Sequence, residues 1–358
     1  MKKLKEFFWP AVALVAVAWS VRLLYLKLWS EAAGEPHVAA LLEKGEFLNN
    51  LEVIAGVIGH KLAAIPVHGY IMAVLCTLVA YAALAWYDRI ALLHLRRAAG
   101  ISWLYTAICS FTTYAISHNI GASVFSGGMV RYRAYTAKGL SVAEIAVLVA
   151  LTSFTFTFGT AICGGLVLLG EPEIVRPLVA MPRHMAMLLG AGMLAVCGLY
   201  VLGSYLRLKP LQIGKFRLEY PTMPIVARQC FAAPLELLGA AGIIYFALPA
   251  DGNPGFFVVV GAFLLSFSAG LLFQVPGGIG VMEVVFLKVM PGLPATSVFA
   301  ALLVWRLFYL LLPLALSIPV VLLFERRQLD KAIHDIIPHE EAAERKPEQG
   351  QERQGAEP

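Results

Sequence analysis

Charged residues are scarce in this sequence. Of its 358 residues, 14% are charged and 59% are hydrophobic, and the mean hydropathy is +0.75. A soluble domain carries roughly 25% charged residues, so this composition excludes an ordinary soluble protein and favours a chain that spans a membrane. The net charge of +5 therefore reports membrane topology rather than nucleic-acid binding, because Lys and Arg gather on the inner side of membrane proteins.

The sequence also lacks the motifs that hold metals or carry catalysis. Its five cysteines are odd in number and form no CxxC pair, so we expect neither a disulfide framework nor a zinc site. It contains no Walker A, HExxH or GxSxG motif, and no paired spacing of metal ligands. We therefore expect no enzyme activity, no cofactor and no bound metal.

Long apolar runs are what the sequence has in abundance. Six of them approach the roughly 20 apolar residues that are needed to cross a bilayer. Two further runs are apolar but interrupted by glycine. The prediction is an all-α polytopic membrane protein with about six full crossings and two re-entrant, Gly-rich hairpins. The six predicted crossings are 7–28, 69–87, 142–169, 185–206, 229–248 and 297–324.

The chain divides into a transmembrane domain and a polar tail. We expect the membrane domain to span 1–326, starting with a retained helix, because the basic start MKKLK is followed by apolar residues without a small-residue cleavage site. The tail, 327–358, is rich in Glu, Gln, Arg and Pro. Such a segment buries little apolar surface, so we expect it to be largely disordered.

Positive charge predicts the orientation of the chain. The loop 29–50 carries four acidic residues and one lysine, which is typical of the outer side. Clusters of Lys and Arg mark the inner side and place both termini in the cytoplasm. These clusters lie at 2–5, 89–97, 131–138, 207–228 and 326–331.

The two interrupted runs, 101–130 and 256–290, cannot be single crossings. The first begins and ends beside inner-side arginines, and the second is flanked by loops without positive charge. Each must therefore enter the membrane and return on the same side, and irregular backbone at that depth must face protein or water. The expected turn residues are Asn119, Gly121, Ser126, Gly127 and Gly128 in the first hairpin and Pro276, Gly277, Gly278 and Gly280 in the second.

The two halves of the sequence show the same order of segments. Each half reads as crossing, crossing, hairpin, crossing, and the halves enter from opposite faces. SGGMVRYR (126–133) can be laid over PGGIGVME (276–283), so that Arg133 falls opposite Glu283. Chance similarity of a Gly-Gly turn is the alternative, but the matching order favours an inverted repeat. Such repeats place substrate sites near the midplane of the membrane.

Ionisable residues within apolar runs are candidates for a binding site. An ionised side chain at the bilayer centre costs roughly 2.5–3.5 kcal/mol, so it faces a partner or a cavity. Glu236 and Arg306 either line a polar cavity or form structural ion pairs, and they can pair with each other. Glu283 is either a cavity residue or a helix-terminus charge at the outer interface. For Asp88 the simple alternative is a local pair with Arg89 or Arg96.

Two arginines follow the first Gly-Gly pair. Arg131 and Arg133 either anchor the inner side of the membrane or bind a phosphate, for which the planar guanidinium is suited. In the same hairpin, His118 adjoins Asn119. This position is more typical of a hydrogen-bonded core histidine than of a proton relay.

Four strings resemble the transmembrane region of the lysylphosphatidylglycerol synthase/flippase family, the multiple peptide resistance factor type. They are WYDRIALLHL, YAISHNIGASVFSGGMVRYRAYTAKGLS, FQVPGGIGVMEVVFL and WRLFYLLLPLALS. The resemblance covers roughly 1–325 and implies a multi-pass protein of the bacterial inner membrane that moves a phospholipid between leaflets. By this resemblance the functional positions are Asp88, Arg131, Arg133, Glu283 and Arg306, with Glu236 in a less distinctive string.

The family's aminoacyl-transferase domain has no counterpart in this sequence, so we expect no synthase activity. The expected cargo is a phospholipid, either aminoacylated or with another charged headgroup. Its phosphate would lie on the three arginines, and its amine or hydroxyl on the three acids. A non-transporting subunit of a lipid- or glycan-modifying enzyme is the main alternative, and an enzyme that acts on lipid is a third. Expected partners are phospholipid and either a second copy or a membrane-bound lipid-modifying enzyme, without nucleic acid.

Overall fold

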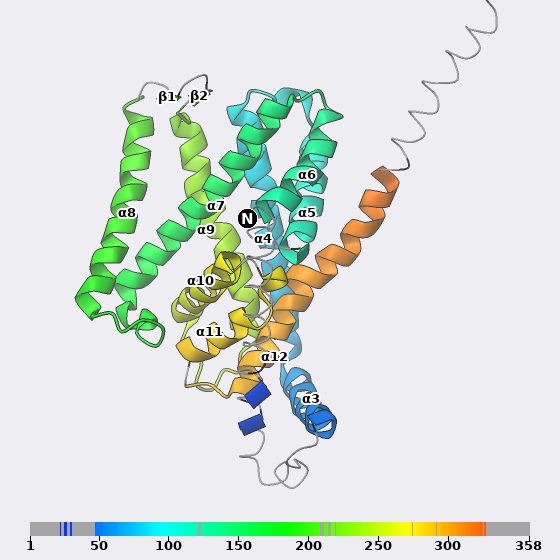
Figure 1. Ribbon diagram of the computed structural model, residues 1–358, viewed down its shortest axis with the longest axis vertical. Coiled ribbons are helices and arrows are strands. Elements are labelled where there is room, and N and C mark those ends of the chain that lie inside the picture. The colour runs from blue at the N-terminus through cyan, green and yellow to red at the C-terminus, as the bar shows by residue number, and fades with distance from the viewer. Residues whose placement is uncertain are drawn as a thin grey trace, which may run out of the picture. The chain divides into compact units, whose positions relative to one another are not determined.

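The computed structural model shows an all-α polytopic membrane protein (Figure 1). It separates into two compact units, Met1–Leu314 and Ala315–Pro358. The predicted polar tail, 327–358, lies outside the described residues. The structure describes residues 22, 25–26, 29–30, 47–120, 123–207, 211–213, 216–218, 220–273, 275–290, 292–324 and 326.

Within the described part of the chain, five helical spans are long and apolar enough to cross a membrane. They confirm five of the six predicted crossings, and the run 7–28 lies largely outside the described residues. The spans are α4 (Val67–His94), α7 (Val142–Gly170), α8 (Arg183–Tyr205), α9 (Met223–Ala247) and Ala295–Phe324, which begins with α12 (Ala295–Trp305) and the π-helical turn η4 (Arg306–Leu311).

Shorter elements complete the described chain. Helix α3 precedes the first described span, and a short antiparallel β-hairpin connects α8 to α9. The remaining helices form the two interrupted segments and short 3₁₀ turns. These elements are α3 (Phe47–Ala64), η1 (Ala98–Gly100), α5 (Trp103–Ile120), α6 (Ser123–Thr136), η2 (Pro172–Val175), β1 (Leu211–Ile213), β2 (Phe216–Leu218), α10 (Phe256–Leu272), η3 (Pro276–Gly278) and α11 (Val281–Val289).

Helix α9 lies at the centre of the first unit because small residues let its neighbours approach closely. A Cβ added to Gly239 would lie 3.0 Å from the main-chain nitrogen of Ala80 on α4. A Cβ added to Gly159 on α7 would lie 2.6 Å from Cβ of Ala233. Since lipid is as apolar as a leucine side chain, close van der Waals packing of this kind is what holds membrane helices together.

The two interrupted segments fold as helical hairpins. In Figure 1 the loops before α5 and after α6 lie at the end of the first unit that carries β1 and β2, and the loops before α10 and after α11 lie at the opposite end. Each hairpin thus returns to the end from which it started, as predicted. The order of crossing, hairpin and crossing is the same for α4 to α7 as for α9 to α12, from opposite ends.

The predicted turn residues are placed correctly in the second hairpin only. Gly277, Gly278 and Gly280 have φ values of +58°, +65° and +79°, a left-handed region that favours glycine. In the first hairpin, by contrast, Ser126, Gly127 and Gly128 lie inside helix α6. Their assignment to the turn was wrong, because α6 begins before them, at Ser123, and Gly127 packs closely against α5 within the helix.

The interruption between α5 and α6 falls between Ile120 and Ser123. The predicted turn residue Gly121 therefore sits in this gap but lies outside the described residues. Asn119 is in the last turn of α5. The register that laid SGGMVRYR over PGGIGVME consequently pairs a helix with a turn, although the order of elements repeats.

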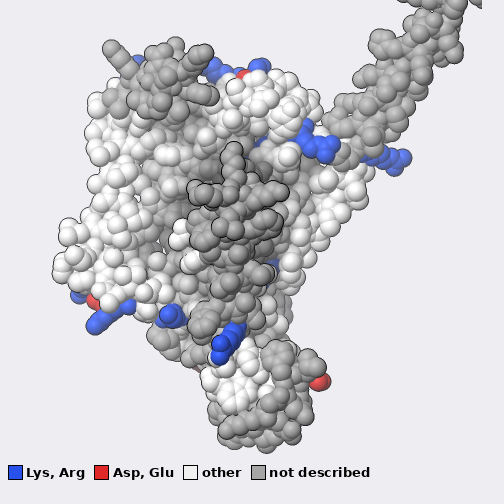
Figure 2. All heavy atoms as spheres, viewed as in Figure 1, with Lys and Arg blue, Asp and Glu red and all other residues white. Residues whose placement is uncertain are grey.

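Charged side chains on the face shown in Figure 2 gather mostly near the ends of the helices. Between them the described surface is largely uncharged. A bilayer requires such a surface, because its hydrocarbon core offers no partner for ions or unpaired polar groups. Charges inside the first unit therefore need partners there.

Candidate functional site

A cavity of about 390 Å³ lies among the helices of the first unit. It is bounded by both hairpins and by the central helices α4, α7 and α9. Its wall is mostly apolar and aromatic, with one arginine, one glutamate, one histidine and a set of hydroxyls. The polar lining residues are Tyr114, Ser117, His118, Arg131, Thr152, Ser153, Thr157, Glu236 and Ser266.

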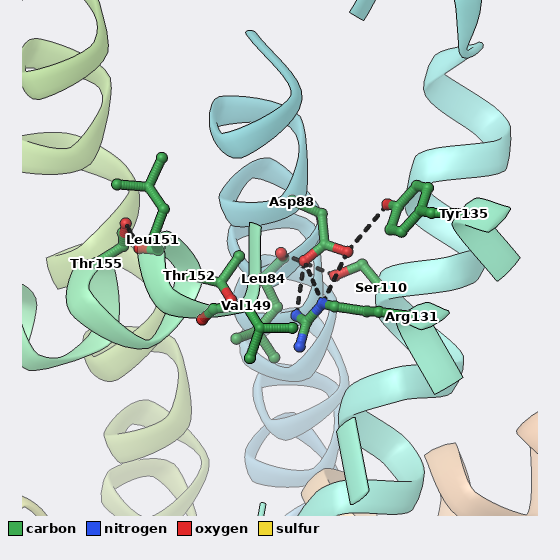
Figure 3. A network of polar contacts seen from close by, with 9 residues as sticks. All are labelled: Leu84, Asp88, Ser110, Arg131, Tyr135, Val149, Leu151, Thr152 and Thr155. Atoms are coloured by element: carbon green, nitrogen blue, oxygen red, sulfur yellow. Dashed lines mark hydrogen bonds and ion pairs between the residues drawn. The ribbon is translucent and has the colours of Figure 1, made fainter. Parts of the chain in front are cut away.

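Arg131 lines this cavity and forms a buried ion pair with Asp88 (Figure 3). Its Nη2 donates to Oδ1 of Asp88 at 2.7 Å, and its Nε lies 3.2 Å from both carboxylate oxygens. Tyr135, one helical turn further along α6, donates its hydroxyl to Oδ2 at 3.0 Å. The side chain of Arg131 is 5% exposed and that of Asp88 is fully buried, so the two charges neutralise each other with little contact with solvent.

Close packing of α5 against α6 holds the guanidinium in place. The Arg131 guanidinium carbon lies 4.9 Å from the centre of the Tyr114 ring, which is a cation–π distance. Gly127 makes room for this arrangement, since a Cβ there would lie 3.2 Å from Thr113 and 3.4 Å from Nη1 of Arg131. The glycine predicted to form a turn thus serves as a packing contact.

A second, partly buried ion pair joins Arg306 to Glu283 at the other hairpin. Nε of Arg306 donates to Oε1 of Glu283 at 2.8 Å, and Nη2 donates to the same oxygen. Nη1 donates to the main-chain oxygen of Gly277 at 2.7 Å, and the Gly280 amide donates to Oε2 of Glu283 at 2.7 Å. This pair therefore ties the Gly-rich turn to the last crossing, and Gly277 itself lines the cavity.

The π-helical turn η4 presents successive side chains to different partners. Arg306 and Tyr309 are three residues apart, a spacing that shares a face in an α-helix. Here Arg306 contacts Glu283, while the Tyr309 hydroxyl donates to Glu236 on α9. A π turn winds less tightly than an α turn and frequently marks a functional site.

Other contacts bind η4 to the first half of the chain. The Tyr81 hydroxyl donates to the main-chain oxygen of Tyr309 at 3.0 Å. Nδ2 of Asn119 donates to the main-chain oxygen of Leu310 at 3.1 Å. The end of α5 and the turn η4 are therefore fixed against each other beside the cavity.

Glu236 is the third buried acid of the site, and it differs from the other two. It is 1% exposed and lines the cavity. Its Oε1 accepts from the Tyr309 hydroxyl, while its Oε2 has no hydrogen-bond partner. Among the described residues no Lys or Arg forms an ion pair with it.

The structure brings together most, but not all, of the predicted site residues. Arg131 and Glu236 line the cavity, and Gly277 connects it to Arg306. Arg133 is exposed and is not part of the lining, because it lies two residues from Arg131 on a helix and so points elsewhere.

Two predicted alternatives for the ion pairs are wrong. Asp88 pairs with Arg131 rather than with Arg89 or Arg96, because it faces the bundle and not the neighbouring loop. Glu236 and Arg306 do not pair, since each meets a different partner.

Tyrosines and hydroxyls of the site were not predicted from the sequence. Tyr114, Tyr135 and Tyr309 contact the three key acidic and basic groups. The sequence could have indicated Tyr135 as a site residue, because it follows Arg131 at a spacing of four residues and so shares its helix face. Among the described residues no group of three or more His, Cys, Asp or Glu side chains is placed to hold a metal ion.

Known proteins include two that are similar to this chain, and no family model matches it. The uncharacterized protein slr0712 of Synechocystis sp. is 31% identical over 241 residues, which is 66% of this chain and 73% of that protein. The inner membrane protein YbhN of Escherichia coli is 28% identical over 228 residues, which is 61% of this chain and 69% of that protein.

Proposed function

The chain belongs to the same family as the Synechocystis protein slr0712, and from this premise we propose that it moves a phospholipid between the leaflets of a bacterial inner membrane. The similarity to YbhN, an inner membrane protein of Escherichia coli, supports this location, and the resemblance to lysylphosphatidylglycerol synthase/flippase proteins supports this cargo. The observation that carries the proposal is the cavity of about 390 Å³ with Arg131 in its wall.

The proposal follows from what a headgroup needs in order to cross hydrocarbon. A phospholipid carries a charged phosphate that is costly to move out of water, while its apolar acyl chains remain in the hydrocarbon of the bilayer. A polar cavity inside an apolar bundle can shelter the headgroup alone. The Arg131 guanidinium suits a phosphate because it offers paired N–H donors, and Asp88 neutralises it when no lipid is bound.

The remaining groups of the cavity fit the same cargo. Hydroxyls such as Ser117, Thr152 and Ser266 line the cavity and can bond headgroup oxygens. Glu236 can accept a hydrogen bond from an amine or a hydroxyl. We propose no chemical change to the lipid, so recovered lipid should have an unchanged mass.

A reconstituted assay tests the proposal. Purified protein would be placed in vesicles that contain trace phosphatidylglycerol, phosphatidylethanolamine or lysylphosphatidylglycerol labelled on a short acyl chain, and outer-leaflet label would be withdrawn with albumin. We expect label from the inner leaflet to become extractable with wild-type protein, and the rate to fall about 100-fold or more for Arg131→Gln if a charge-assisted contact worth roughly 3 kcal/mol is lost.

The matched control is Arg97→Gln. Arg97 pairs with Glu144 at the surface and does not line the cavity, so its loss should leave the rate unchanged. Absence of movement for every headgroup, together with co-purification of a stoichiometric lipid-modifying enzyme, would overturn the proposal in favour of an accessory subunit.

A further inference from the structure

Among the residues that the structure describes in the first unit, three acids are buried, and two of them are neutralised by arginine. Asp88 pairs with Arg131 and Glu283 pairs with Arg306. Glu236 has no such partner among the described residues, although it is as deeply buried as the other two. The site thus contains one buried acid, Glu236, whose charge is not neutralised by either ion pair.

The titratable groups that the structure places around Glu236 are tyrosines and a cysteine, which carry no charge when protonated. Tyr81 and Tyr87 face it from α4, Tyr114 from α5 and Cys163 from α7. Tyr309 of η4 donates its hydroxyl to Oε1. None of these groups supplies a positive charge.

A carboxylate in this setting holds a proton more readily than a charge. Burying an ionised carboxylate without a cation costs several kcal/mol, whereas a protonated carboxyl is a neutral group that can donate a hydrogen bond. Oε2 of Glu236 has no hydrogen-bond partner, and the residue lines the cavity. A cavity of about 390 Å³ has room for the water that would deliver or remove a proton.

His118 supplies a second unpartnered group on the same cavity. Its Nδ1 is buried without a hydrogen-bond partner, so the predicted hydrogen-bonded core histidine does not describe this nitrogen. Its ring stacks on that of Tyr309, with ring centres 5.4 Å apart and planes 18° apart. Glu236 and His118 therefore both contact Tyr309, one through its hydroxyl and one through its ring.

We propose that Glu236, with His118 across Tyr309, is a proton-binding site that opens on the cavity and couples lipid movement to the proton gradient. This inference rests on the proposed lipid translocation. A hydronium ion in the cavity water gives up one proton to Oε2, so that one O–H bond of the hydronium breaks as the carboxyl O–H bond forms. In the reverse step the carboxyl O–H bond breaks and the proton re-forms hydronium with a cavity water.

Charge balance links the proton to the lipid. The Asp88–Arg131 pair contributes no net charge, so the protonation of Glu236 and His118 sets the charge of the empty cavity. A phosphate headgroup enters more readily when Glu236 is protonated, because a second negative charge in the same low-dielectric space repels it. The lipid and the proton therefore move in the same direction.

The first experiment detects the proton without any transport. Wild-type protein in phospholipid vesicles would be treated with dicyclohexylcarbodiimide, which modifies protonated carboxyls in apolar surroundings, and the adducts would be mapped by mass spectrometry. We expect an adduct at Glu236 that declines as the pH rises and none at Asp88 or Glu283, the two acids paired with arginine. Glu236→Gln should lose the adduct.

The second experiment measures the coupling. Acyl-labelled phosphatidylglycerol would be equilibrated across vesicles that hold a pH difference of one unit. One proton per lipid predicts about a tenfold enrichment of label in the leaflet on the alkaline side, whichever way the protein is inserted. Glu236→Gln should abolish this enrichment, and His118→Gln should shift the pH at which movement is fastest.

The outcomes separate the two proposals. Equal distribution of moving label at every pH difference would overturn the coupling and leave lipid translocation standing. A selective adduct at Glu236 without any lipid movement would overturn translocation and support the proton site. Equal labelling of Glu236, Asp88 and Glu283 would overturn the proton site, and fluorescence unfolding of each variant would identify any that fails to fold.

Discussion

The two hairpins of this protein each contribute one member of a buried ion pair, but with opposite sign. In α5–α6 the hairpin supplies the arginine, Arg131, and the preceding crossing supplies Asp88. In α10–α11 the hairpin supplies the acid, Glu283, and the following crossing supplies Arg306. The same structural problem, holding a hairpin inside an apolar bundle, is thus solved twice with the charges exchanged.

The surroundings of the two pairs differ as well. The first pair joins helix to helix and is almost fully buried, with side chains 5% and 0% exposed. The second also holds the Gly277 carbonyl and the Gly280 amide, and its arginine is 13% exposed. The first pair therefore joins helix α6 to helix α4 beside the cavity, whereas the second stabilises a Gly-rich turn whose Gly277 borders the cavity.

The largest loss of stability should come from breaking the ion pair between Asp88 and Arg131. Arg131→Ala leaves Asp88 as an uncompensated buried charge, which should lower the free energy of unfolding by about 3–5 kcal/mol. Equilibrium unfolding in mixed detergent micelles, followed by tryptophan fluorescence, would measure the change. Adding Asp88→Ala should restore part of the loss, and strictly additive single effects would show that the pair is not coupled.

Breaking the second pair should cost less. Arg306→Ala should lower the free energy of unfolding by about 3 kcal/mol, the lower end of the range for a buried pair, because water reaches the site more easily. Glu283→Ala removes the other member of the same pair, and we expect a similar loss in the same unfolding measurement. A loss larger than that of Arg131→Ala would reverse the comparison between the two pairs.

The glycine pairs of the two hairpins should respond in opposite directions. Gly278→Ala places a side chain at φ +65° and should destabilise by about 1–2 kcal/mol. Gly128→Ala lies in helix α6 with nothing within 4 Å of the added Cβ, so it should stabilise by up to about 1 kcal/mol. Equal effects in thermal unfolding would contradict the different conformations described for the two pairs.

The smallest effect is expected at the surface. Arg97 and Glu144 form an ion pair whose side chains are 48% and 23% exposed, and exposed pairs contribute little because solvent screens them. Arg97→Ala should therefore leave the unfolding midpoint within error of wild type. A shift comparable with that of Arg306→Ala would mean that burial is not what separates these pairs.

The crossings and the hairpin topology could be predicted because the length of an apolar run and the sign of the charge on a loop are local properties of the sequence. Val142–Gly170, for instance, combines an uninterrupted apolar run with a capping box in which Ser141 and Glu144 bond each other's main-chain amides. The turn of the first hairpin could not be located in the same way. Gly127 and Gly128 look like a turn in isolation, and only the packing of α5 against α6 shows that they are helical.

The partners within the site could not be predicted for a related reason. The sequence identifies Asp88, Glu236 and Glu283 as acids that need explaining, because charge in an apolar run is expensive. Which of them meets an arginine depends on the rotation of each helix, which a sequence pattern does not determine. Tyr309 illustrates the point, since its contact with Glu236 depends on a π turn for which the string RLFYLL carries no recognised signal.

That π turn has a consequence for alignments within the family. A π turn holds one more residue than the α turn it replaces, so a homologue that lacks one residue between Arg306 and Leu311 would continue as a regular α-helix. The side chain at position 309 would then point in a different direction relative to that at 306, because the two helices differ in the number of residues per turn. Such a homologue would keep one of the two contacts, Arg306 with Glu283 or Tyr309 with Glu236, and lose the other. A single gap at this point in an alignment therefore separates family members that make both contacts from those that make only one.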